Sequence, residues 1–395
     1  MAKQTVRDLG DLAGTRVFVR VDYNVPVENG AITDDTRIRA SLPTLQHLIG
    51  AHGRLVLASH LGRPKKGPAP ELSLKPVAAR LAELLGAPVD MAPDCVGPEV
   101  KKRADALADG RVLLLENVRF HPEEEKNDAE FARRLIADSG ATVFVNDAFG
   151  TAHRAHASTE GVSRHVKRAV AGLLMEKELR YLGLALHRPE HPFVAILGGA
   201  KVSDKIQVIE SLLPRVDALL VGGGMAYTFF RAQGLPTGKS LVEEDKVDLA
   251  RGLLQRAAGK LKLPTDHVVA AAFKEDAEHR TLPVGETPEG WMGLDIGPRT
   301  AEAFAREAAG AKLALWNGPM GVFEMKPFAQ GTLAVARALA DAPGTSIVGG
   351  GDSVAAITQM GLAEKIDHVS TGGGASLEFL SGDALPGVEC LQEAS

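Results

Sequence analysis

The chain carries the stretch VAILGGAK at residues 194–201, in which a continuous apolar run ends in two glycines and a lysine. An apolar run without polar alternation is typical of a strand covered on both faces, as in a parallel sheet. Glycine lets the backbone approach a phosphate, and the N-terminus of a following helix favours an anion. The stretch therefore predicts a buried parallel strand that ends at an anion site.

Similar apolar runs recur along the sequence and alternate with segments of helical periodicity, such as residues 206–213. This alternation predicts an α/β fold with two doubly wound, Rossmann-like parallel-sheet domains. The predicted strands are residues 17–21, 55–58, 112–115, 142–145, 194–197, 218–221, 268–272, 312–316 and 345–348.

A connecting helix is predicted over residues 173–186, where Met175, Leu179, Leu182 and Leu186 fall at helical spacing before a proline. We expect it to act as a hinge between an N-terminal domain, residues 1–172, and a C-terminal domain, residues 173–375.

The composition indicates a folded chain: 395 residues, 45% hydrophobic and 24% charged. A formal net charge of −5 argues against general affinity for nucleic acid or membranes. The cysteines are Cys95 and Cys390, without metal-like spacing, which favours a reduced setting over secretion. The N-terminus is unlike a signal peptide, and no apolar stretch reaches about 18 residues. We therefore expect a cytoplasmic protein.

Arginines recur where strands of the first half end or helices begin, at Arg37, Arg63, Arg119 and Arg154. Carboxyl ends of parallel strands are the usual ligand position, and guanidinium groups match phosphate or carboxylate oxygens. A single arginine would more often form a surface ion pair. Four at successive strand ends favour a site for a small polyanion.

Other polar residues follow the same strands, namely Asp22, Asn24 and His60. Together with His153 and His156, His60 could suggest a metal site, but no carboxylate or cysteine joins these histidines at recognisable spacing. We expect anion contacts or structural hydrogen bonds instead.

The second half carries its glycines in clusters after strands, at residues 198–199, 222–224, 349–351 and 372–374. Lys201 and Lys205 are expected four apart on one helix, where an anion would relieve their repulsion, although both could simply face water. Asp352 follows the third cluster, where a carboxylate can hold magnesium beside phosphates or serve as a helix N-cap.

Two motifs of familiar nucleotide binders are incomplete. GLPTGKS at residues 234–240 is one residue short of a Walker loop and follows a helix-like segment, so we reject it. The cluster at residues 222–224 has Tyr227 where a dinucleotide fingerprint needs a small residue, which weakens a nicotinamide interpretation.

Several long stretches resemble the phosphoglycerate kinase family, and the resemblance extends from Arg16 to Leu391. They are RVDYNVP at 20–26, SHLGRP at 59–64, GTAHRAH at 150–156, LGGAKVSDK at 197–205 and WNGPMGVFE at 316–324. Departures are conservative, with Ser353 where relatives often carry Thr and Tyr227 where many carry Phe.

The resemblance implies reversible phosphoryl transfer between ATP and the carboxylate of 3-phosphoglycerate, giving ADP and 1,3-bisphosphoglycerate. It implies that the N-terminal domain binds 3-phosphoglycerate, that the C-terminal domain binds nucleotide with Mg²⁺ on Asp352, and that the chain is a monomer whose tail, residues 376–395, returns to the N-terminal domain. The implied 3-phosphoglycerate residues are Asp22, Asn24, Arg37, His60, Arg63, Arg119 and Arg154. The implied nucleotide residues are Lys205, Gly223, Gly224, Leu241, Gly293, Leu294, Asn317, Pro319, Val322, Glu324, Gly350, Gly351, Asp352 and Ser353.

The predicted mechanism needs no protein nucleophile, because the substrate carboxylate is ionised at neutral pH and can attack the γ-phosphorus itself. Catalysis would then be in-line positioning and charge stabilisation after hinge closure, at the 173–186 helix and near Gly372. We expect Arg37, Lys201 and the helix N-terminus at Gly373 to stabilise the transferring group. The alternatives are a non-catalytic metabolite sensor and a nicotinamide dehydrogenase.

Overall fold

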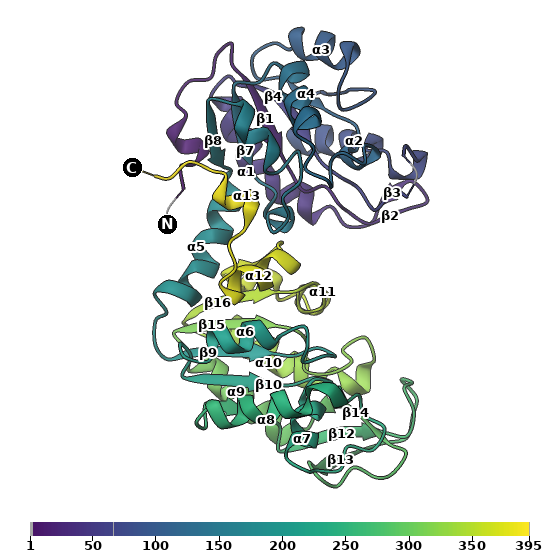
Figure 1. Cartoon of the computed structure of the whole chain (residues 1–395). Coiled ribbons are helices and arrows are strands. Elements are labelled where there is room, and N and C mark those ends of the chain that lie inside the picture. Colours follow the sequence, from purple (N-terminus) through teal and green to yellow (C-terminus); the bar gives the residue numbers. More distant parts are fainter. Residues whose placement is uncertain (1–2, 66, 395) are drawn as a thin grey trace. The chain divides into compact units, whose positions relative to one another are not determined.

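The computed structural model describes residues 3–65 and 67–394, and the chain forms two compact units. One unit contains the chain up to Arg180 together with the segment from Ala384 onward, and the other contains Tyr181–Asp383. The first boundary falls inside helix α5 (Leu173–His187), which confirms the helix predicted there, and the chain passes back to the first unit between Asp383 and Ala384. Figure 1 labels many of the helices and strands of each unit.

The first unit is built on a six-stranded parallel sheet with the order β5-β6-β4-β1-β7-β8. Helices lie against this sheet (Figure 1). The strands are β1 (Arg16–Arg20), β4 (Arg54–Ala58), β5 (Val89–Met91), β6 (Val112–Leu114), β7 (Val143–Asn146) and β8 (Arg168–Ala171). The helices are α1 (Thr36–Gly50), α2 (Lys75–Leu85), α3 (Pro98–Asp105), α4 (Ala129–Ser139) and α13 (Pro386–Glu389), and a short hairpin pairs β2 (Val27–Glu28) with β3 (Ala31–Ile32).

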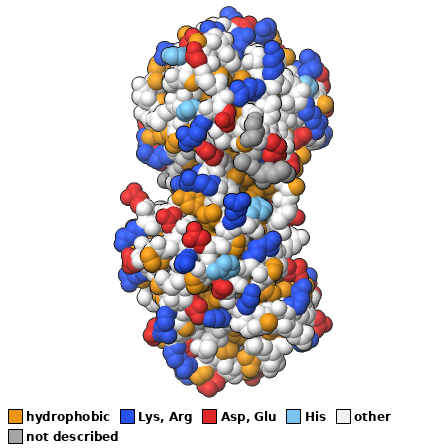
Figure 2. All heavy atoms as spheres, turned by 90° about the vertical axis from the view of Figure 1, so that its left-hand side faces the viewer, with side chains coloured by type: hydrophobic (Ala, Val, Ile, Leu, Met, Phe, Trp, Pro, Cys, Tyr) orange, Lys and Arg blue, Asp and Glu red, His pale blue; other side chains and the backbone are white. Residues whose placement is uncertain are grey.

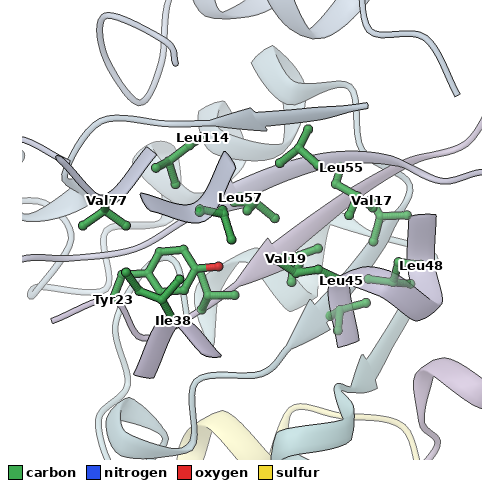
Figure 3. Close-up of a cluster of buried hydrophobic side chains, with 14 of the residues drawn as sticks. Val17, Val19, Tyr23, Ile38, Leu45, Leu48, Leu55, Leu57, Val77 and Leu114 are labelled. Atoms are coloured by element: carbon green, nitrogen blue, oxygen red, sulfur yellow. The ribbon is translucent and has the colours of Figure 1, made fainter. Parts of the chain in front are cut away.

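Both faces of this sheet are buried, as its continuous apolar strands require. Val17 and Val19 point to one face and pack with Leu45 and Leu48 of α1 (Figure 3). Phe18 points to the opposite face and is also fully buried, with its ring 6.3 Å from that of Phe144. Successive strand residues alternate between faces, so an all-apolar strand is stable only when both faces are covered.

The second unit has a six-stranded parallel sheet with the order β11-β10-β9-β15-β16-β17. The strands are β9 (Phe193–Leu197), β10 (Ala218–Val221), β11 (Leu261–Lys262), β15 (Leu313–Asn317), β16 (Thr345–Gly349) and β17 (His368–Val369). The helices are α6 (Ile206–Leu212), α7 (Ala226–Ala232), α8 (Val247–Arg256), α9 (Pro298–Ala309), α10 (Gln330–Asp341), α11 (Gly351–Gln359) and α12 (Gly374–Ser381). The two parallel sheets confirm the predicted α/β fold class.

One predicted strand differs from the parallel arrangement. The run at residues 268–272 corresponds to β12 (Asp266–Ala270), which pairs antiparallel with β13 (His279–Pro283) and β14 (Met292–Ile296) in a separate three-stranded sheet. The prediction that this strand is parallel was therefore wrong. All five β12 residues, including Asp266 and His267, are buried, so the strand resembles a parallel-sheet strand in its burial on both faces.

The face of the molecule in Figure 2 carries lysine and arginine side chains interspersed with aspartate and glutamate. Within the described ranges, every helix is too short or too polar to cross a lipid bilayer.

Candidate active site

The parallel sheet of the first unit brings its strand ends to one edge. Residues that follow β1, β4, β6 and β7 therefore share that edge, as parallel strands require. They include Asp22 and Asn24 after β1, His60 and Arg63 after β4, and Arg119 after β6. Arg154 follows β7, and Arg37 lies in the first turn of α1. We call these residues the arginine cluster, defined as Asp22, Asn24, Arg37, His60, Arg63, Arg119 and Arg154.

Hydrogen bonds within the arginine cluster fix its loops. Arg37 Nη1 donates to Asp22 Oδ2 at 2.7 Å. The backbone of Gly62 is held from two sides, because its N–H donates to Asn24 Oδ1 at 2.8 Å and its carbonyl accepts from Arg119 Nη1 at 2.9 Å. The loop after β4 is therefore tied to the loops after β1 and β6.

Positive charges converge on Arg119 within the arginine cluster. Burial lowers the pKa of Arg119, Glu125 opposes this shift, and the positive charges of Arg154 and Arg63 lower it further. Arg119 Nε lies 3.4 Å from Glu125 Oε1, yet it is a buried donor without a hydrogen-bond acceptor among the described residues. Converging cations and an unsatisfied donor favour a phosphate or carboxylate ligand.

Two of the histidines near this cluster, His60 and His156, are held in the neutral form near neutral pH. Burial holds the pKa of His60 well below its ordinary value, and the charges of Arg20, Arg119 and Arg37 lower it further. Burial and neighbouring arginines lower the pKa of His156 to about 4. His153 Nε2 lies 3.0 Å from Arg154 Nε and accepts its hydrogen bond.

In the second unit, glycine loops line a cavity of about 610 Å³, which we call the polar cavity. It contains Lys201 and Lys205, but these lysines precede α6, which begins at Ile206. The expectation that both lie on one helix was wrong. Ser203 N–H and Oγ–H donate to the Glu243 carboxylate at 3.0 and 2.6 Å. These hydrogen bonds stabilise a turn before α6, so the helix does not begin at the lysines.

Lys205 is the buried cation of the polar cavity. Its Nζ donates to Asn317 Oδ1. Burial lowers the lysine pKa to about 8, while Asp204 and Asp352 oppose the shift. Asn317 Nδ2 is buried and has no acceptor among the described residues. A phosphate oxygen would supply both an acceptor for the amide and a counter-charge for the lysine.

The glycines allow backbone contacts that no side chain would permit. A Cβ at Gly198 would lie 2.1 Å from the carbonyl oxygen of Pro319. Gly350 has a φ of +87° and is the N-cap of α11, so Asp352 is not the cap but lies in the first turn. Ser353 accepts a hydrogen bond from the Gly318 N–H at 2.6 Å, which joins α11 to the loop after β15.

A second cavity of about 660 Å³, which we call the apolar cavity, has aliphatic and aromatic walls. Gly199, Ala200 and Asp352 line both cavities, so the two adjoin. Every residue of the predicted nucleotide set lines one of them. The apolar cavity has Gly223, Gly224, Leu241, Gly293, Leu294, Pro319, Val322, Glu324 and Asp352, and the polar cavity has Lys205, Asn317, Gly350, Gly351, Asp352 and Ser353, along with Lys201 and Gly373.

Sequence reasoning missed one wall of the apolar cavity. Tyr227 Oη lies 2.8 Å from His267 Nδ1, and both residues line the cavity beside β14. Burial lowers the pKa of His267 to about 4, so its ring is neutral. His267 belongs to the antiparallel β12, whose apolar pattern was assigned to a parallel sheet. The one sequence signal for an antiparallel sheet is the neighbouring strand β13, which is polar and exposed as strands of a fully covered parallel sheet are not.

Sequence reasoning also missed a buried polar group behind the arginine cluster, made of Arg20, Glu124 and Ser158. Arg20 Nε donates to Ser158 Oγ at 2.8 Å, and Ser158 Oγ donates to Glu124 Oε1 at 2.6 Å. Arg20 is the last residue of β1, but Ser158 and Glu124 lie more than a hundred residues away in the sequence, so no local pattern identifies them.

An α/β protein with adjoining apolar and glycine-lined cavities in one unit, and an arginine cluster in the other, has the features of a nucleotide-dependent phosphotransferase. Residues 6–383 match the family model for phosphoglycerate kinase. The phosphoglycerate kinase of Moorella thermoacetica is 61% identical over the whole of both chains. A cytosolic phosphoglycerate kinase of Triticum aestivum is 59% identical over 99% of each chain.

Solved structures agree with the sequence relatives. The structure of phosphoglycerate kinase from Coxiella burnetii superposes with a TM-score of 0.88 at 42% identity, covering 98% of each chain. The chain belongs to the phosphoglycerate kinase family. It transfers a phosphoryl group reversibly between ATP and the carboxylate of 3-phosphoglycerate, a reaction of glycolysis and gluconeogenesis. This activity decides against the dehydrogenase and the non-catalytic sensor.

Proposed function

We propose that the two adjoining cavities of the second unit bind the nucleotide, with the base in the apolar cavity and the phosphates in the polar cavity. The observation that carries this assignment is the shared lining at Gly199, Ala200 and Asp352, which joins a base-sized apolar space to a loop of glycines and lysines. Glu324 lines the apolar cavity and would accept hydrogen bonds from ribose hydroxyls. Lys205 and Asn317 would bind phosphate oxygens.

The donors at the junction of the cavities fit Mg²⁺. Asp352 offers a hard carboxylate oxygen in the first turn of α11, next to the space assigned to the phosphates. Magnesium in nucleotide sites is commonly held by one or two carboxylates together with phosphate oxygens and water. When bound, the ion would neutralise charge on the phosphates.

The arginine cluster of the first unit is the proposed 3-phosphoglycerate site. Its guanidinium groups match a ligand that carries a phosphate and a carboxylate, and the unsatisfied Arg119 Nε offers one donor. Asp22 and Asn24 would bind the hydroxyl of the substrate while they hold Arg37 and the Gly62 loop.

The chain's own residues would act by positioning and by stabilising charge. The substrate carboxylate is the nucleophile, so no side chain needs to remove a proton. Lys201, Arg37 and the backbone N–H groups at the N-terminus of α12 would stabilise negative charge on the transferring group. Because the proposed sites belong to different units, transfer requires the substrates to approach, and we infer that α5 acts as the hinge.

We also propose that the chain is a monomer and that it is located in the cytoplasm. The cytosolic relative from Triticum aestivum supports the location.

Substitution of the proposed transition-state cations tests the assignment. We expect Lys201→Ala and Arg37→Ala each to lower kcat about 100-fold or more, because loss of one charge-stabilising donor costs about 3 kcal/mol. A coupled assay of ATP consumption with 3-phosphoglycerate would measure this. Lys239→Ala is the control, since Lys239 lines the apolar cavity away from the phosphate loop and should alter KM for ATP more than kcat. An unchanged kcat in Lys201→Ala would overturn the assigned role.

A further inference from the structure

A buried guanidinium lies directly behind the arginine cluster. Arg20 is the last residue of β1, and it is only 1% exposed. Its register partner in β4 is Ala58, two residues before His60. The sheet therefore places Arg20 beside the strand end that carries His60.

Hydrogen bonds hold the Arg20 guanidinium at two of its nitrogens. Its Nε donates to Ser158 Oγ at 2.8 Å, and its Nη1 donates to the carbonyl of Val21. Ser158 in turn donates to the fully buried Glu124 through Oγ at 2.6 Å and through its backbone N–H at 2.9 Å. The Glu124 carboxylate balances the charge of Arg20 and fixes the serine that orients it.

The remaining terminal nitrogen of Arg20 faces the histidine. Arg20 Nη2 lies 3.3 Å from His60 Nδ1. A guanidinium has donors and no acceptor, so His60 Nδ1 must be the acceptor and carry no proton. A neutral imidazole has one proton, which must then be on Nε2. Nε2 has no hydrogen-bond partner among the described residues. Because it is not fully buried either, it keeps contact with solvent.

We propose that Arg20 is a positioning residue that fixes His60 in its Nε2–H tautomer and so presents a neutral hydrogen-bond donor to the anion of the arginine cluster. The inference rests on the proposed binding of 3-phosphoglycerate at that cluster. A neutral donor adds a hydrogen bond without adding repulsion to Arg37 and Arg119, which already face the histidine.

The arginines around His60 disfavour a second proton on its ring, since Arg20, Arg119 and Arg37 all lower its pKa. The carboxylate oxygen Oδ1 of Asp22 lies 4.0 Å from Nδ1 and would favour a proton there, but Arg20 Nη2 is closer to Nδ1, at 3.3 Å. A proton on Nδ1 would point at the guanidinium of Arg20 and break the contact. His60 should therefore remain a neutral donor across the physiological pH range.

Nitrogen NMR of the intact, ligand-free chain labelled at histidine tests the tautomer directly. We expect the His60 signals, identified by their loss in His60→Gln, to show a protonated Nε2 and an unprotonated Nδ1 near neutral pH. A proton on Nδ1, or a doubly protonated ring, would overturn the proposal. This measurement does not depend on where 3-phosphoglycerate binds, so it separates failure of the tautomer from failure of the proposed site.

A double-mutant cycle tests the consequence for binding. We expect Arg20→Met to raise KM for 3-phosphoglycerate about tenfold, with a smaller effect on kcat, since one hydrogen bond to a charged ligand is at stake. The matched control is Arg16→Met, which removes an arginine from the other end of β1, where it pairs with Asp105.

The combined variant Arg20→Met/His60→Gln should be no worse than His60→Gln alone, because Arg20 acts through the histidine. Additive losses would contradict the proposal. If Arg20→Met does not fold, Ser158→Ala replaces it in the cycle, because this change removes the hydroxyl that orients Arg20 Nε and bonds to Glu124 but keeps the guanidinium itself.

Discussion

At the scale of single residues, Lys205 has the environment with the clearest consequence for nucleotide binding. Burial lowers its pKa to about 8, and among the described residues its Nζ donates to an uncharged amide oxygen, that of Asn317. A lysine that pairs with phosphate must be protonated, and phosphate binding raises its pKa. Below about pH 8 the free protein already carries the proton, whereas above it binding requires proton uptake.

We therefore predict that affinity for MgADP falls as pH rises above about 8, by about tenfold at most for each pH unit. Titration calorimetry near neutral pH and about two units higher would measure the fall, and buffers of different ionisation enthalpy would report the proton uptake. Lys205→Arg keeps its charge over this range and should lose the pH dependence. The same affinity at both pH values in the unmodified chain would count against this role.

At the scale of secondary structure, helix α5 begins on a buried carboxylate. Asp147 Oδ1 accepts from the N–H groups of Leu174 and Met175 at 2.9 and 3.3 Å. Burial raises the aspartate pKa to about 7, although a hydrogen bond with Thr44 and the two backbone hydrogen bonds oppose the shift. Asp147 Oδ2 is buried and has no partner among the described residues. The start of the connecting helix is thus sensitive to pH.

The sign of this dependence follows from the raised pKa. The folded chain keeps a proton on Asp147 up to about pH 7, whereas the unfolded chain loses it near its ordinary value of 3.8. The stabilisation from this proton is present at low pH and is lost as pH rises through about 7. We predict that Asp147→Asn, which keeps an oxygen acceptor, gains stability relative to the unmodified chain between about pH 5 and pH 8.

Urea denaturation across this pH range would measure the difference. The control is Asp128→Asn at the N-cap of α4, where the side chain accepts from the Phe131 N–H at 2.8 Å but the residue is exposed. A pH-independent difference for Asp147→Asn would show that the buried carboxylate is not the cause.

The sequence predicts these elements well where burial alone decides them. Strands β1, β4, β9 and β15 are apolar on both faces because both faces are covered. In the sequence this appears as apolar runs without alternating polar residues. The same pattern does not encode strand direction. For this reason the buried β12 was expected in a parallel sheet, and the His267 wall of the apolar cavity was missed.

Long-range contacts set the other limit. The turn that carries Lys201 and Lys205 depends on Ser203 bonding to Glu243, forty residues away, so a local periodicity could not reveal it. The positions of individual site residues were predictable from glycine clusters and strand ends together with family motifs. The partners that orient them, such as Glu124 behind Arg20, were not.

At the scale of the whole molecule, the C-terminal segment is part of the first unit. Its backbone is bonded to the sheet region, since Gly387 N–H donates to the Ala152 carbonyl and Asn146 Nδ2 donates to the Gly387 carbonyl, both at 2.8 Å. Leu385, Val388 and Leu391 are buried. The unit is therefore made of two stretches that are distant in sequence.

We predict that truncation after Asp383 destabilises the chain by roughly 4 kcal/mol or more, since burial of each such side chain contributes about 1.5–3 kcal/mol. Thermal and urea unfolding would measure the loss. Truncation after Gln392 keeps the three buried side chains and is the matched control. Equal stability of the two truncated chains would contradict this role for the segment.

MgADP should bind in the cavities of the second unit and 3-phosphoglycerate at the arginine cluster of the first, and calorimetric binding of each substrate to variants of each unit tests this most directly. We expect Asp352→Asn to weaken MgADP binding about tenfold or more and to leave 3-phosphoglycerate binding unchanged, whereas Arg119→Met should do the reverse. If Arg119→Met weakens MgADP as much as 3-phosphoglycerate, or Asp352→Asn abolishes binding of both, the assignment of one substrate to each unit is wrong.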